Sequence, residues 1–204
     1  SVRRAYGTMA SVVGVITNLI LFAGKLVVGT LVGAISITAD AFNNLSDAGS
    51  QIISFISFKI SAKPADREHP FGHARIEYVA SMIVSFLVLL VSYELFTGSL
   101  GKLINPEPPS REKWIVTIAV LAISVLIKLW LGLFNRTLGK KICSSVMFAT
   151  AADSLSDALS TSAVMIGMIL YLVFGWVRVD AIMGMAVSVV IFIAGVKILN
   201  DTKN

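Results

Sequence analysis

Two ten-residue stretches of the chain, 41–50 and 151–160, carry the residues best suited to chemistry. They are identical at six of ten positions, and both lie inside long apolar segments. A carboxylate in the hydrocarbon of a membrane costs about 2.5 kcal/mol or more, so acidic residues in such segments usually mark a path for ions or protons. The sequence therefore predicts a membrane protein organised around a buried acidic site.

Each stretch places two oxygen-bearing side chains four residues apart, Asn43 with Asp47 and Asp153 with Asp157. Residues at this spacing lie on one face of a helix. Together they offer four oxygen-donor side chains and three formal negative charges, most of which a divalent cation would neutralise. Without metal, clustered carboxylates in a low dielectric cannot all stay ionised. Competition of metal and protons for one site is the chemical basis of antiport.

The elements that must position these residues are membrane helices. The chain of 204 residues is 56% hydrophobic and only 14% charged, whereas about a quarter of the residues of a soluble domain are charged. Apolar runs of about 20 residues, enough to cross a bilayer as helix, begin near Met9, Ile35, Val79, Trp114, Ser144 and Ala181. We therefore expect an all-α integral membrane protein of six transmembrane helices, and the single cysteine excludes an internal disulfide.

The net charge of +5 is interpreted as a topology signal and not as nucleic-acid binding. With the N-terminus inside, the cytoplasmic side collects Arg3, Arg4, Lys59, Lys63, Arg67, Arg75, Arg136, Lys140, Lys141, Lys197 and Lys203, and the outside Lys102, Arg111, Lys113 and Arg178. Eleven basic residues against four is a positive-inside bias. Both termini are therefore expected in the cytoplasm.

The repeated stretch falls in the second and fifth expected spans, so its two copies run antiparallel. That is the arrangement of an inverted repeat, which in transporters places the substrate site near the membrane midplane. Ten aligned residues leave a second interpretation open, in which two helices acquired the same polar face because they line one site.

Buried acids also have a structural interpretation. Lys25 and Lys128 lie within spans and can pair with carboxylates in an ion-pair network that holds helices together. For one aspartate this would be the favoured interpretation, but duplicated motifs favour a metal site. Asp40, one turn before Asn43, is an accessory candidate: a metal ligand, an acceptor behind the ligands, an exit-path group or a helix–helix contact.

Three motifs in combination resemble the cation diffusion facilitator family: residues 39–47, residues 63–73 and residues 153–157. The similarity covers essentially the whole chain. It implies a six-span homodimeric exporter that moves divalent transition metals out of the cytoplasm in exchange for protons. It also implies that the transport site is formed by Asn43, Asp47, Asp153 and Asp157.

The resemblance bears on the metal as well. Zinc-transporting members usually have histidine where Asp153 stands, and this set has oxygen donors alone. Hard oxygen ligands suit Mn²⁺, whereas imidazole suits Zn²⁺. We therefore expect Mn²⁺ as the transported ion, with Zn²⁺ second and Fe²⁺ also open, and no prosthetic group.

A second metal site is expected in the cytoplasmic connection between the second and third spans. Asp66, His69 and His73 match a loop site of the same family, and both histidines of the chain lie there. Carboxylate and imidazole ligands suit Zn²⁺. The alternative is a connection packed at the membrane surface, with the histidines hydrogen-bonded to backbone.

Family members usually continue after the sixth span into a cytoplasmic metal-binding domain. Residues 1–204 are accordingly expected to be the six-helix transport domain without it, in a bacterial inner membrane. Two other functions stay open at this stage. One is a metal-sensing or channel-like membrane protein; the other is an intramembrane aspartyl hydrolase, whose Gly-x-Gly-Asp signature is absent.

Overall fold

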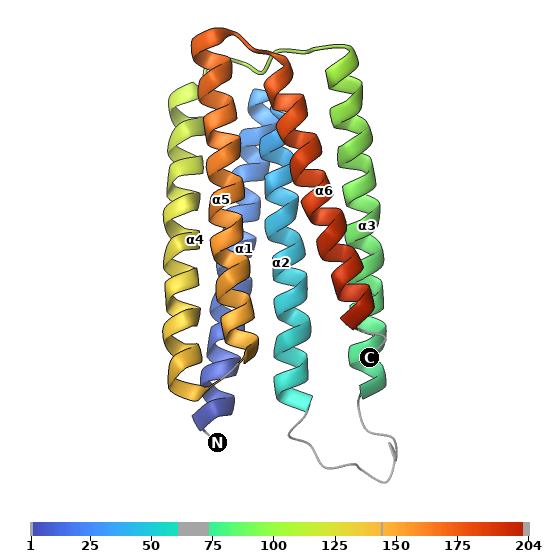
Figure 1. Ribbon diagram of the computed structural model, residues 1–204, viewed down its shortest axis with the longest axis vertical. Helices are drawn as coiled ribbons and strands as arrows, with labels where there is room; N and C mark the ends of the chain where they lie inside the picture. The colour runs from blue at the N-terminus through green and yellow to red at the C-terminus, as the bar shows by residue number, and fades with distance from the viewer. Residues whose placement is uncertain (1, 61–73, 144, 202–204) are drawn as a thin grey trace.

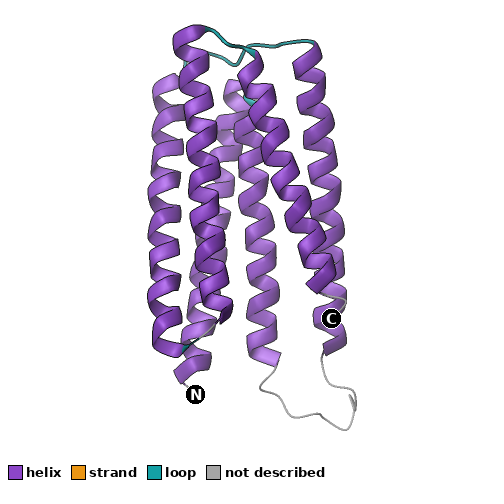
Figure 2. Cartoon of the chain, in the orientation of Figure 1, coloured by secondary structure: helices purple, strands orange, loops and turns teal. Residues whose placement is uncertain are grey.

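Six long helices form an antiparallel bundle in the computed structural model, which describes residues 2–60, 74–143 and 145–201 (Figure 1). The elements are α1 (Val2–Val32), α2 (Ile35–Ile60), α3 (Ala74–Ile104), α4 (Trp114–Ile142), α5 (Ser145–Phe174) and α6 (Arg178–Asp201). Figure 2 shows only helices and loops in this part of the chain. The expected all-helical class with six helices is confirmed.

Five of the six helices are long and apolar enough to cross a membrane, and α2 is not among them. The expectation of six apolar spans is therefore met only in part. The physical reason is the polar face of α2, which carries Asp40, Asn43, Asn44, Ser46, Asp47, Ser50 and Gln51. In Figure 1, α2 nevertheless runs the length of the bundle beside the other helices.

Short connections set the antiparallel order of the helices. Gly33, with φ 73°, turns the chain from α1 into α2, and Gly175, with φ 70°, opens the turn between α5 and α6. Glycine adopts this left-handed conformation at no steric cost. Both turns lie at the end of the bundle opposite the two chain termini, which Figure 1 places at one end.

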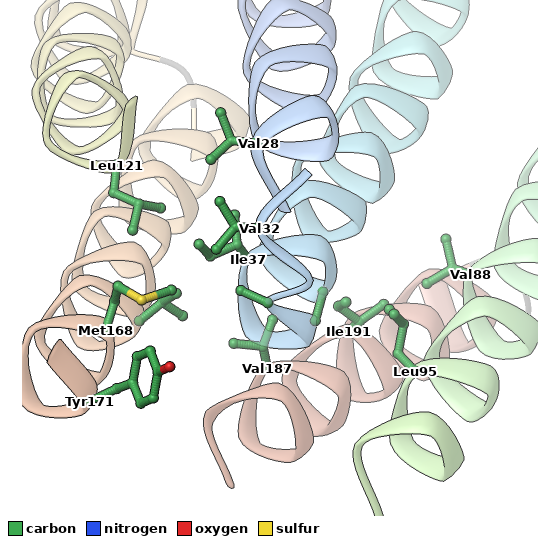
Figure 3. Close-up of a cluster of buried hydrophobic side chains, with 13 residues drawn as sticks. Val28, Val32, Ile37, Val88, Leu95, Leu121, Met168, Tyr171, Val187 and Ile191 are labelled. Carbon is green, nitrogen blue, oxygen red and sulfur yellow. The ribbon is translucent and has the colours of Figure 1, made fainter. Parts of the chain in front are cut away.

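A cluster of buried apolar side chains fills the bundle from these turns toward its middle (Figure 3). All six helices contribute, and the cluster includes Val28, Val32, Ile37, Val88, Leu95, Leu121, Met168, Tyr171, Val187 and Ile191. The Tyr171 hydroxyl donates a hydrogen bond of 2.7 Å to the carbonyl oxygen of Pro109, which ties the connection before α4 to α5. Toward the termini, by contrast, α5 and α6 spread apart in Figure 1.

Asp180 joins α6 to the start of α2. Its two carboxylate oxygens accept hydrogen bonds from the backbone N–H groups of Ile35 and Ser36, at 3.0 and 3.1 Å. The first N–H groups of a helix have no partner within the helix, and a negative charge there also interacts favourably with the helix dipole. A residue at the N-terminus of α6 therefore caps α2.

We expect Asp180→Ala to lower the free energy of unfolding by about 1–3 kcal/mol, because it leaves buried backbone donors without an acceptor. Thermal unfolding in detergent measures the change. Glu112→Gln, which replaces an exposed acid at the same end of the bundle, is the control and should unfold like the wild-type chain. Equal stability of the Asp180→Ala and wild-type chains would contradict this role.

Candidate metal centre

The two repeated stretches meet inside the bundle. Asn43 on α2 and Asp157 on α5 are both buried, and the Asn43 amide nitrogen donates a hydrogen bond of 2.8 Å to Asp157 Oδ1. The helices α2 and α5 run in opposite directions (Figure 1). Because the Asn43 nitrogen is engaged, its carbonyl oxygen is the atom left to act as a metal ligand.

A lysine from a third helix completes the cluster. The Lys128 ammonium group on α4 lies 2.8 Å from Asp47 Oδ2 and 2.7 Å from Asp157 Oδ2. Its side chain is 1% exposed, whereas those of Asp47 and Asp157 are 22% and 12% exposed. A buried charge is stable only when it is paired and hydrogen-bonded. Lys128 therefore pairs with both carboxylates from the more buried side of the cluster.

Asp153 is the fourth expected ligand, and its side chain is exposed. It precedes Asp157 by one turn of α5, toward the end where α5 and α6 spread apart in Figure 1. Among the described residues, no three acidic, histidine or cysteine side chains lie close enough together to hold a metal ion. The structure thus brings Asn43, Asp47 and Asp157 into one cluster and leaves Asp153 at its edge.

The charges of this cluster have a simple balance. With the three side chains charged, Asp47, Asp157 and Lys128 sum to one negative charge, and Asp153 raises the total to two. A divalent cation bound among the four groups would neutralise the set. The two carboxylates are more exposed than Lys128, and oxygen-bearing side chains from two helices are suited to binding a divalent cation.

Asp40 occupies a separate ion pair. Its Oδ2 lies 2.8 Å from the ammonium group of Lys25 on α1, and both side chains are buried. Lys25 also donates a hydrogen bond of 3.0 Å to the Thr161 hydroxyl on α5, which in turn donates to Asp40 Oδ1 at 3.2 Å. Of the roles considered for Asp40, this geometry matches the helix–helix contact, joining α1, α2 and α5.

The sequence-based interpretation did not assign two further buried polar residues. Asn18 on α1 and Asn44 on α2 are fully buried, and within the described part of the chain their amide atoms form no hydrogen bond with protein groups. Asn44 follows Asp40 by four residues and precedes Asp47 by three, so its spacing places it on the same face of α2. That spacing was the signal available in the sequence.

The expected loop site lies outside the described residues. Asp66, His69 and His73 all fall within 61–73, between α2 and α3. Metal binding by these three residues stays a prediction.

A protein family and several curated proteins are similar to this chain. The chain matches the cation efflux transmembrane domain family over residues 11–203. It is 30% identical over 163 residues to the manganese efflux system protein MneS of Bacillus subtilis, an alignment that covers 80% of this chain and 56% of that protein. It is 32% identical over 184 residues to the magnetosome protein MamB of Paramagnetospirillum magneticum, covering 89% and 60%.

An uncharacterised transporter of Methanocaldococcus jannaschii is also similar, with 32% identity over 180 residues that cover 88% of this chain and 62% of that protein. The chain thus spans 56% to 62% of the length of these three curated relatives.

Proposed function

Because the chain belongs to the cation diffusion facilitator family, whose members are transporters and not enzymes, we propose that it exports a divalent metal cation from the cytoplasm in exchange for protons. The observation that carries this proposal is the meeting of Asn43, Asp47 and Asp157, from two antiparallel helices, in one polar cluster inside an apolar bundle. The family assignment also removes the intramembrane hydrolase from consideration.

We propose that Asn43, Asp47, Asp153 and Asp157 bind the transported ion. Carboxylate and amide oxygens are hard ligands, which favours Mn²⁺ over metals that prefer nitrogen or sulfur. The name of one relative, a manganese efflux system protein, supports the same metal. Zn²⁺ and Fe²⁺ are the next candidates for this site.

The arrangement of the bundle supports a path toward the chain termini. The apolar cluster of Figure 3 fills the bundle from the opposite end toward its middle, and α5 and α6 diverge toward the termini (Figure 1). Together with the positive-inside bias of the basic residues, this leads us to place both termini and the accessible side of the site in the cytoplasm. In this arrangement α2 also crosses the membrane, in addition to the five apolar helices, and its polar residues face the neighbouring helices.

Three further elements of the proposal come from the family resemblance. The transporter is a homodimer in a bacterial inner membrane. Its residues 1–204 form the transport domain, to which a cytoplasmic domain is added in the usual family architecture. Asp66, His69 and His73 form a second, cytoplasmic metal site.

Flux measurements test the function. In proteoliposomes containing the chain and a lumenal pH indicator, we expect Mn²⁺ entry to be accompanied by proton movement in the opposite direction. Asp47→Asn should abolish both signals because it removes a charged ligand. Mn²⁺ entry without proton movement would indicate a channel. Zn²⁺ flux without Mn²⁺ flux would contradict the argument from oxygen ligands, and absence of flux for both metals would favour a sensor.

A further inference from the structure

Among the residues that the structure describes, Lys25 and Lys128 are fully buried lysines within helices, and they have different surroundings. Lys25 contacts one carboxylate, that of Asp40, and the Thr161 hydroxyl. Lys128 instead contacts two carboxylates from two different helices, Asp47 on α2 and Asp157 on α5. A helix–helix ion pair needs only the first arrangement. The second places a positive charge at the centre of a cluster proposed to bind cations.

The Lys128 contacts use the oxygens that a metal ion would need. Lys128 binds Oδ2 of both aspartates, and Oδ1 of Asp157 already accepts the hydrogen bond from Asn43. A divalent cation shared by Asp47 and Asp157 would need oxygens within about 2.0–2.6 Å, the distances of Mg²⁺ and Ca²⁺ ligands. Metal and ammonium cannot occupy the space between the two carboxylates at the same time.

We propose that Lys128 is a tethered competitor of the transported ion: its ammonium group fills the metal position in the empty transporter, and a divalent cation must displace it to bind. This inference rests on the proposed function and adds to it a specificity-determining residue. Lys128 lies on the buried face of α4, which also includes Leu121, Ser124, Leu131 and Asn135. The carboxylates are the more exposed side of the cluster, so an entering ion meets them first.

Competition of this kind selects for charge. A monovalent ion that displaces the ammonium group replaces one unit charge with another and gains nothing in Coulomb energy, while it loses its hydration shell. A divalent ion doubles the charge between the carboxylates, and the attraction is strong because a partly buried site screens it weakly. Lys128 therefore excludes Na⁺ and K⁺ from the empty site and lets a divalent ion enter.

The test compares Lys128→Met with Lys25→Met, a matched control that removes the other buried lysine. Equilibrium Mn²⁺ binding is measured on the whole chain in detergent by calorimetry, without NaCl and with NaCl at about 0.1 M, where the Debye length is about 10 Å. We expect Lys128→Met to bind Mn²⁺ at least about tenfold more tightly than the wild-type chain, since the ion then no longer has to displace an ammonium group from the two carboxylates. Mn²⁺ binding by Lys128→Met should also become weaker in the presence of Na⁺, whereas Lys25→Met should show neither change. Loss of structure cannot raise affinity, so tighter binding separates competition from a purely structural role.

A second measurement uses the wild-type chain and does not depend on folding of the variants. Solid-state NMR of protein labelled with ¹⁵N-lysine reports on the two buried ammonium groups. Addition of diamagnetic Cd²⁺ should shift the Lys128 signal and leave that of Lys25 in place. Lys128→Arg, which keeps the charge, assigns the signal and should bind Mn²⁺ no more tightly than the wild-type chain.

The outcomes distinguish the two proposals. If the wild-type chain binds Mn²⁺ through Asp157 and Lys128→Met binds it no more tightly, this inference is wrong and the proposed function stands. Tighter binding with an unmoved Lys128 signal also overturns it, because the lysine then acts from beside the ion without leaving its place. If neither the wild-type chain nor Lys128→Met binds Mn²⁺, Zn²⁺ or Fe²⁺, both proposals fail.

Discussion

Replacement of Asp157 by asparagine is expected to reduce Mn²⁺ flux by at least about a hundredfold while the protein stays folded. Residues that only orient metal ligands already cost 10–100-fold in affinity or activity when they are mutated, and Asp157 is proposed as a direct ligand. Asp157 also contacts both other helices of the cluster, through Asn43 on α2 and Lys128 on α4. Initial Mn²⁺ uptake into proteoliposomes measures the loss.

The fold should survive this change because Lys128 keeps its ion pair with Asp47, so the variant does not leave a buried charge unpaired. Size-exclusion chromatography and thermal unfolding check that expectation. Glu94→Gln, which replaces an exposed acid on α3, is the matched control and should transport at the wild-type rate. Wild-type flux in Asp157→Asn, with the variant folded, would remove the central claim about the site.

The spacing of polar residues was sufficient to predict part of this cluster. Asn43, Asp47 and Asp157 lie at helical intervals within apolar segments, and in a membrane such faces must turn toward each other because lipid cannot satisfy them. The structure places these three side chains together. Five of the six described helices follow from hydropathy, since apolar runs of about 20 residues allow little else in a bilayer.

The contribution of Lys128 could not be predicted in the same way. It is separated from Asp47 by 81 residues and from Asp157 by 29, so no local periodicity links it to them. Which buried lysine reaches which aspartate depends on how α1 and α4 are rotated about their axes, and packing between helices sets that rotation. The sequence indicated only that Lys25 and Lys128 were available for ion pairs.

Asp153 and Asp180 show a second limit of the sequence. Helical spacing puts Asp153 on the face of Asp157, yet its side chain is exposed, in the part of α5 that lies toward the end where α5 and α6 diverge (Figure 1). Asp180 caps a helix that starts 145 residues earlier. Both facts depend on the angle and position of whole helices, which residue intervals within one segment do not specify.

The exposed position of Asp153 makes it the best residue for changing the metal. We expect Asp153→His to raise the ratio of Zn²⁺ to Mn²⁺ flux by about tenfold or more, because imidazole is a better ligand for Zn²⁺ and removal of a carboxylate weakens a site for hard ions. The substitution should be tolerated, since an exposed side chain can change without altering the packing of the bundle. Parallel uptake of the two metals into proteoliposomes gives the ratio.

Asp153→Asn separates the two causes of that change. Asparagine removes the same negative charge but adds no ring nitrogen, so it should weaken transport of both metals without favouring Zn²⁺. If Asp153→Asn shifts the ratio as far as Asp153→His does, charge at this position and not ligand type decides the metal. If neither variant changes the ratio or the rate, Asp153 is not a ligand. The ion would then be held by Asn43, Asp47 and Asp157 alone, the three residues that already lie together in the bundle.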